Sequence, residues 1–309
     1  DYYENALFNH ILASQAPLVG AGAFVYYTPL RPDFGRAYGT DFHSFWCCTG
    51  TGMENHARYG QFIYSHDATA LTVNLFLASE LNWRERGVAL RQETRFPDEA
   101  GSTLVFTAVP ANSLTLRIRH PFWLAGQRLS LSVNGRAVKV TPQPGGYAEL
   151  TRKWQAGDRV KIELPMKIRV VRQEQAPGWV SFFYGPILLA GELGSEATTQ
   201  ADYIGLYTPI KALRPLAKAP VIIASRDEDM AARVTPVPGR PGAFRTSGLV
   251  KPSDVTLAPF FRTHFQRYAI YWQVSDLESW EANQRNIAEA ERLQRELDAR
   301  TVDGVRIGE

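Results

Sequence analysis

Apolar residues recur with helical spacing near both ends of the chain and with strand spacing between them. Over residues 1–15, Tyr3, Leu7 and Ile11 fall on one side of a helix, and a second helical pattern covers roughly 51–65. From 279 to 300 the composition is helical again, but the apolar stripe is thin. We therefore expect a short helical region first and a surface or linker helix last.

From about residue 68 the period changes to two. Alternating or β-rich runs cover 71–77, 113–119, 129–133, 137–140, 159–164, 179–189 and 268–274. Asn134-Gly135 stands between two of them and predicts a hairpin with a type I′ turn. Many short strands with frequent turns are typical of an antiparallel β-sandwich. The stretch 194–250 is less regular and predicts a long, decorated connection.

These patterns predict an α+β multidomain chain. We assign 1–66 to a helical segment with a cysteine loop, 67–275 to a β-sandwich domain and 276–309 to a C-terminal helix or linker. Two helices cannot bury a core alone, so the first segment should belong to a larger helical domain whose remainder lies upstream. The chain opens on Asp1 without a signal-peptide pattern, so the N-terminus leaves periplasm and cytoplasm equally open.

Composition excludes two classes of partner. The net charge is +3 and no run of Lys or Arg exceeds two residues, so nucleic-acid binding has no electrostatic footprint. No apolar run is long enough for a transmembrane helix. Aromatic residues make up 12%, which suits sugar-binding faces and equally suits sandwich cores.

The two cysteines, Cys47 and Cys48, are adjacent. Neighbouring cysteines rarely form a disulfide, because the ring between them is strained. Two thiolates could instead bind one zinc ion, and one thiolate could act as a nucleophile. The alternative is that both are small buried hydrophobic residues. His43 or His56 could supply a third ligand, although each is more often a loop or core histidine.

Other chemistries have weaker support. Without CxxC or HExxH a zinc-finger or zincin site is excluded, and without GxSxG or a phosphate loop we reject serine-hydrolase and nucleotide-binding functions. Glu4 and Glu54 lie on the helices that flank the cysteines. Paired carboxylates are the usual acid and base of glycosidases, although a solvated surface glutamate is the commoner case.

Three segments together resemble a known family. Two of them are similar to its E-x-x-L-[YF]-N helix and its Y-x-[NT]-P-L turn, and the third is close to its W-C-C-x-G-T-G-M-E-N signature. A fourth, shorter match is similar to its R-h-P-x-W pattern. The family is the β-L-arabinofuranosidase clan, glycoside hydrolase families 127 and 146, with 146 the nearer pattern. The segments are 4–9, 26–30, 44–55 and 119–123.

The resemblance implies a fold and a mechanism. The family folds as an (α/α)6 barrel followed by β-sandwich domains, so 1–66 would be the last part of the catalytic barrel. Its members are retaining and use a zinc-bound cysteine nucleophile with a glutamic acid as acid/base. Carried over, Cys47 is the nucleophile, Cys47 and Cys48 are zinc ligands, and Glu4 and Tyr26 contact the sugar.

The resemblance also implies what lies elsewhere. The remaining zinc ligands, a Glu and a Cys, and the acid/base Glu would precede residue 1, so the partner of this chain is the missing N-terminal part of the same protein. The family also continues past residue 309, so the chain looks cut at both ends. Where the first family of the clan has a further cysteine, this chain has Phe45.

The expected function is therefore that of a zinc-dependent β-L-arabinofuranosidase acting on plant glycans that contain L-arabinofuranosides. Two alternatives stay open. One is a non-catalytic carbohydrate-binding sandwich with structural cysteines. The other is a glycosidase of the same clan that acts on another furanose or on an acidic sugar.

Overall fold

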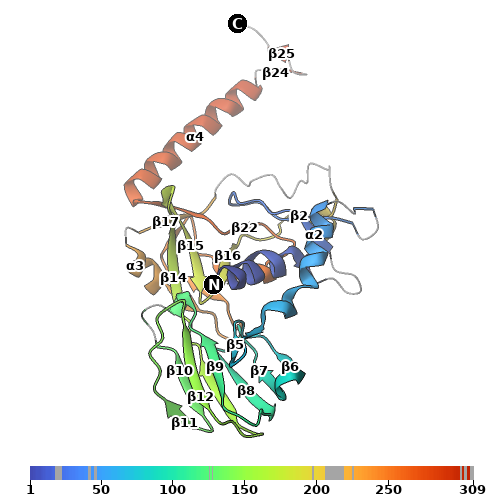
Figure 1. The fold of residues 1–309 in the computed structure, drawn as a ribbon. Coiled ribbons are helices and arrows are strands. Elements are labelled where there is room, and N and C mark those ends of the chain that lie inside the picture. Colours follow the sequence, from blue (N-terminus) through green and yellow to red (C-terminus); the bar gives the residue numbers. More distant parts are fainter. Residues whose placement is uncertain are drawn as a thin grey trace.

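The computed structural model describes residues 1–17, 23–40, 43–44, 47–124, 126, 128–196, 198–205, 219–224, 226–299, 301–302 and 305–306. The chain is mostly β-sheet, with a short helical region at the start and one long helix at the end (Figure 1). The expected (α/α)6 barrel is not visible among the described residues, whose N-terminal region holds two α-helices.

The N-terminal region begins with a continuous helical stretch. Helix α1 (Tyr2–Ala6) runs into a π-helical turn, η1 (Leu7–Ile11), and a 3-10 turn, η2 (Leu12–Ser14). A three-stranded sheet follows, built from β1 (Gln15–Ala16), β2 (Ala23–Tyr27) and β3 (Ala37–Tyr38). The first predicted helix is confirmed.

The second helix differs from its prediction. Helix α2 covers Cys47–His56 and is followed by a 3-10 turn, η3 (Tyr59–Phe62), and by strand β4 (Tyr64–His66). The sequence predicts a helix over 51–65, so the helix begins and ends earlier than expected. The cysteines therefore open a helix and do not lie in a loop. Glycine disfavours helices, which explains the wrong prediction. Here Gly52 packs against Phe24, whose ring carbon would lie 3.2 Å from an added Cβ, so tertiary packing overrides local propensity.

Two sheets pack together in the first half of the β region. One has six strands and the other has four. Leu104 and Phe106 of the first and Leu116 and Ile118 of the second belong to one buried cluster. The six-stranded order is β11 (Arg136–Val138), β10 (Ser130–Val133), β13 (Arg159–Glu163), β8 (Gly101–Ala108), β7 (Val88–Glu93), β6 (Ser79–Trp83), and the four-stranded order is β12 (Tyr147–Arg152), β9 (Leu114–Arg119), β5 (Ala70–Val73), β4.

The hairpin predicted at Asn134-Gly135 is confirmed. Both residues have positive φ, 52° and 78°, as a type I′ turn requires, and β10 pairs with β11 across them. The prediction of purely antiparallel sheets is wrong at two places. Strand β5 pairs with β9 in parallel, and β17 (Val221–Ile223) pairs with β23 (Trp272–Ser275) in parallel. Parallel neighbours need long crossovers, and an alternating pattern carries no information on strand direction.

A ten-stranded sheet forms the second half of the β region. Its main path is β18 (Val234–Pro236), β19 (Phe244–Thr246), β21 (Thr256–Pro259), β16 (Ile187–Glu192), β15 (Ala176–Tyr184), β23 (Trp272–Ser275), β17 (Val221–Ile223), β20 (Val250–Lys251). Strand β14 (Ile168–Gln173) pairs with β15, and β22 (Tyr268–Ala269) pairs with β16. Short helical elements lie between strands of all three sheets: η4 (Arg84–Arg86), η5 (Phe122–Leu124), η6 (Gln200–Tyr203), η8 (Phe260–Arg262) and α3 (Asp227–Ala232). The expected irregular connection at 194–250 therefore contributes four strands, and residues 206–218 within it lie outside the described part of the chain.

The last helix, α4 (Leu277–Ala299), projects away from the sheets toward the two-stranded β24 (Thr301–Val302) and β25 (Val305–Arg306) (Figure 1). None of its residues is buried, and Leu293 and Leu297 are 47% and 44% exposed. This matches the expected surface helix. Among the described helices, none combines the length and apolar character that a bilayer span requires.

Candidate active site

The cysteine pair lies at the first turn of α2. Cys47 and Cys48 are exposed and free, and their Sγ atoms are 3.7 Å apart. A disulfide would need about 2.05 Å, so the two thiols are not bonded to each other. The amide end of a helix carries partial positive charge, which favours a thiolate there. The hydrogen bond between the two thiols is the main reason that the pKa of Cys48 is raised.

Buried polar contacts fix the segment that leads into α2. The backbone N–H of Thr40 donates to Ser44 Oγ at 2.7 Å, and the Thr49 hydroxyl donates to the Ser44 carbonyl at 3.1 Å. Gly39 leaves room for this arrangement, because an added Cβ would lie 3.0 Å from Ser44 Cβ. Both Ser44 and Thr49 are buried. The thiols are therefore exposed, while hydrogen bonds to the buried Ser44 hold the start of their helix in place.

The histidines considered as zinc ligands do not join the cysteines. His56 ends α2, nine residues after Cys47, which places it roughly 13 Å away along the helix. Its ring packs edge-on to Phe24 at 5.4 Å, and its Nδ1 lies 2.7 Å from the Gly52 carbonyl. His43 is exposed. Within the described residues no three His, Cys, Asp or Glu side chains gather as metal ligands would.

The cysteine pair alone has a spacing that zinc can use. With Zn–S bonds of about 2.3 Å, two thiolates on a tetrahedral zinc lie roughly 3.8 Å apart. The Sγ atoms of Cys47 and Cys48 are already at 3.7 Å without any rotamer change. The pair therefore fits two of the four positions of a tetrahedral site, and the described residues do not supply the other two.

Glu4 is buried in an ion-pair network and is only 2% exposed. Its carboxylate accepts one bond from Arg119 at 2.5 Å and another from the Trp123 indole N–H at 2.7 Å. Arg119 also donates to Asp1 at 2.7 Å and to the Asn74 carbonyl at 2.6 Å. Helix α1 is thereby joined to the end of β9. Both Glu4 oxygens have protein partners, and contact with a sugar remains a prediction for this residue.

Tyr26 is half-buried on β2. Its ring packs edge-on to Tyr27 at 4.5 Å, and Tyr27 is 58% exposed. Strand β2 lies beside α2, as Figure 1 shows. The predicted sugar contact of Tyr26 therefore shares a neighbourhood with the cysteine helix, whereas Glu4 faces the four-stranded sheet.

One buried cluster escaped the sequence analysis. Arg36 is 1% exposed and donates to the Ala13 carbonyl at 2.5 Å and to the Phe260 carbonyl, and it stacks on the Phe260 ring at 3.9 Å. His264 donates from Nε2 to the Phe261 carbonyl at 2.8 Å, so its Nδ1 is the acceptor for the Tyr38 hydroxyl at 2.7 Å. Burial first, and Arg36 second, lower the pKa of His264 to about 4.

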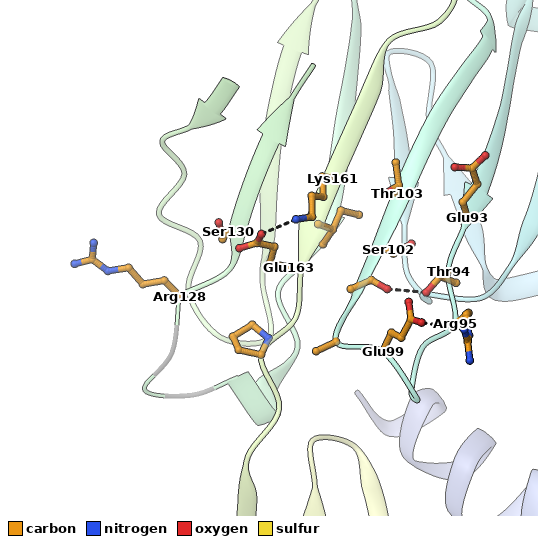
Figure 2. A pocket seen from close by; sticks show the side chains of 14 residues that line it. Glu93, Thr94, Arg95, Glu99, Ser102, Thr103, Arg128, Ser130, Lys161 and Glu163 are labelled. Carbon is orange, nitrogen blue, oxygen red and sulfur yellow. Dashed lines mark hydrogen bonds and ion pairs between the residues drawn. The ribbon is translucent and has the colours of Figure 1, made fainter. Parts of the chain in front are cut away.

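A hollow of about 650 Å³ lies along β7, β8 and β13 (Figure 2). Most of its charged side chains are already paired: Lys161 contacts Glu163 at 3.0 Å, and Arg95 contacts Glu99 at 3.2 Å. Arg128 also lines the hollow, and its side chain points outward (Figure 2). Glu93 is held by Arg159 at 2.7 Å. Because these charges largely cancel within the hollow, it offers no strong field to an ionic ligand.

Comparison with solved structures places this fold among glycoside hydrolases. A GH127 β-arabinofuranosidase superposes with a TM-score of 0.63 at 20% identity, over 88% of this chain and 45% of its own. A GH127 β-L-arabinofuranosidase from Geobacillus stearothermophilus T6 gives 0.60 at 21% identity, over 89% and 46%. A protein described as a glycoside hydrolase gives 0.61 at 21%, over 88% and 48%. The chain thus spans just under half of the length of each.

Sequence models of domain families divide the chain into three. Residues 1–61 match the catalytic domain of GH127 β-L-arabinofuranosidases, and 70–166 match the GH127 middle domain. Residues 169–274 match a domain of unknown function, DUF4986. Because the catalytic and the middle domain models of GH127 match consecutive parts of one chain, it is a GH127-like protein. No curated protein matches it in sequence.

Proposed function

We propose that this chain supplies the nucleophile and two metal ligands of a retaining, zinc-dependent β-L-arabinofuranosidase. The observation that carries the proposal is the pair of free, exposed thiols at the start of α2, 3.7 Å apart, within the segment matched by the GH127 catalytic domain. On this proposal residues 1–66 are the last part of an (α/α)6 barrel. The acid/base Glu and the other zinc ligands, a Glu and a Cys, belong to that barrel upstream of residue 1.

Cys47 would act as the nucleophile of a double displacement. Its Sγ bonds to the anomeric carbon while the bond to the leaving oxygen breaks and the acid donates a proton to that oxygen. Water then attacks the same carbon, the carbon–sulfur bond breaks, and the carboxylate takes a proton from that water, which restores the acid. The thiolate is restored, and two inversions give net retention.

The chain's own residues prepare Cys47 for this role. The start of α2 favours the thiolate, and the bonds from Thr40 and Thr49 to Ser44 hold the helix start in place. Zinc, when bound by Cys47 and Cys48, would keep both thiols deprotonated at neutral pH. The substrate class is an L-arabinofuranoside of a plant glycan, in keeping with the family.

The test is hydrolysis of an aryl β-L-arabinofuranoside by the complete gene product and by its Cys47→Ala variant, with rates expressed per bound zinc. We expect the variant to lose activity by about 10⁴-fold or more, because nucleophile deletions in enzymes cost that much. Thermal unfolding of both proteins controls for folding. Activity that survives in Cys47→Ala would refute the cysteine nucleophile, and an inactive complete protein would exclude this substrate.

A further inference from the structure

A second cavity, of about 540 Å³, lies between the first helical stretch and the ten-stranded sheet. Its floor is the face of the sheet that carries Ser181 and Phe183 of β15 and Leu188 of β16. Asn5 of α1 and His10 of η1 line the opposite wall. The cavity therefore joins the segment matched by the catalytic domain to the domain of unknown function.

Buried hydrogen bonds hold both walls in place. Asn9 is 4% exposed, donates to the Pro186 carbonyl at 2.9 Å and accepts from the Leu188 N–H at 2.8 Å. Ser181 donates to the Ile270 carbonyl at 2.8 Å. Arg36 ties together Ala13 and Phe260, which both line the cavity. The cavity is thus formed before any ligand arrives, as small-molecule sites usually are.

The lining carries the hydrogen-bonding groups of Asn, Gln, Ser, Thr, Tyr and His side chains and no Asp, Glu, Lys or Arg side chain. Within the described part of the chain, the side chains of Thr28, Gln173 and Tyr271 make no hydrogen bond to protein, although they line this cavity. Asn5 uses only its oxygen, which accepts from Asn9 at 2.8 Å. Several donors and acceptors are therefore available to a ligand.

Aromatic rings stand beside these polar groups. Phe183, Phe260 and Tyr271 all line the cavity. Arg169 lies over the Phe183 ring at 5.3 Å and Arg36 lies over the Phe260 ring. Each of these two rings therefore already makes a cation–π contact. Tyr271 has no such contact among the described residues. Its ring is therefore the available apolar surface in a lining that also holds the Thr28 hydroxyl and the Gln173 amide.

We infer that this cavity binds a neutral saccharide of one or two residues. A sugar presents apolar C–H faces beside hydroxyl groups, which matches a tyrosine ring flanked by amides and hydroxyls. A phosphate or a carboxylate would find no Lys or Arg side chain in the lining, and a purely apolar ligand would leave the amides unpaired. The volume lies within the range of about 300–1,000 Å³ for small-molecule sites. The choice of L-arabinose as the first ligand rests on the proposed function.

The experiment is calorimetric titration of the 309-residue chain with L-arabinose and with an arabinose disaccharide. Wild-type chain and the Cys47→Ala variant should bind alike. Gln173→Ala should weaken binding by about 3- to 10-fold, the worth of one hydrogen bond, and Tyr271→Ala by about tenfold or more. Gln155→Ala is the matched control, because Gln155 is exposed and does not line the cavity, and it should bind as wild type.

Three outcomes would overturn the inference. They are absence of binding to the wild-type chain, unchanged binding in both pocket variants, and loss of binding in Cys47→Ala alone, which would place the sugar at the cysteines. Thermal unfolding of each variant separates a lost site from a lost fold. Hydrolysis by the complete protein is measured separately, so a failure of the proposed function and a failure of this site give different results.

Discussion

Among the buried arginines that join the N-terminal segment to the rest of the chain, Arg119 and Arg36 are balanced in different ways. Arg119 faces carboxylates, Glu4 at 2.5 Å and Asp1 at 2.7 Å. Arg36 faces carbonyls, aromatic rings and the acceptor nitrogen of His264. The first connection is an ion pair, whereas the second holds a cation with neutral groups only. Burial of a charge can thus be compensated by opposite charge or by dipoles, and the two respond differently to substitution and to pH.

The largest effect should come from breaking the ion pair. Arg119→Met leaves Glu4 buried with only the Trp123 N–H, and we expect a loss of about 3–5 kcal/mol in the free energy of unfolding. Urea unfolding of the chain measures it. The double variant Arg119→Met, Glu4→Gln should recover part of the loss. A loss under about 1 kcal/mol would show that the pair is not a strong connection.

The cluster of Arg36 and His264 should make the free energy of unfolding depend on pH. His264 is neutral in the fold because burial and Arg36 lower its pKa from 6.5 to about 4. The unfolded chain therefore binds more protons between these values, and stability falls as pH drops from about 6.5 toward 4. At full effect the loss is about 3 kcal/mol.

Unfolding curves at several pH values test this sign. His264→Gln, which keeps an acceptor but does not titrate, should flatten the slope between pH 6.5 and 4.5 relative to wild type. An equal slope in the two proteins would contradict the role of His264. Arg36 and Tyr38 face the ring, and neither changes charge in this range.

The smallest losses of stability should come from removing one hydrogen-bond donor, either from the charged Glu4 carboxylate or from the neutral His264 ring. Trp123→Phe removes one donor from the Glu4 carboxylate, and Tyr38→Phe removes one donor from neutral His264. Hydrogen bonds to charged groups are the stronger, so we expect losses of about 2 and about 1 kcal/mol. Thermal unfolding of both variants gives the order. The reverse order would mean that local packing outweighs the charge of the acceptor.

Sequence patterns predicted local features well. The Asn134-Gly135 hairpin, the alternating strands and the exposed last helix follow from short-range rules. The cysteine pair was recognised because its neighbours form a specific motif. The parallel pairing of β5 with β9 was not predicted. Three strands of the six-stranded sheet lie between these two strands in the sequence, so no short-range pattern links them.

The buried contacts of Arg36 and Glu4 could not be predicted from the sequence, because their partners are distant in the chain. Arg36 and His264 are 228 positions apart, and neither belongs to a motif. Glu4 was recognised as important, but its partners Arg119 and Trp123 come from a segment more than a hundred residues later. Helix α2 holds Gly52 against Phe24, a tertiary contact that helix propensities do not include.

Helix α4 gives the molecule a built-in spacer. Its 23 residues correspond to about 35 Å of length, and Arg292 supports it through Glu289 at 2.7 Å and Glu296 at 2.6 Å. Since no side chain of α4 is buried against the sheets, the helix sets how far the β24–β25 hairpin stands from the last strand of the body. In solution the chain should therefore scatter X-rays as an elongated particle, with a maximum dimension set by this helix.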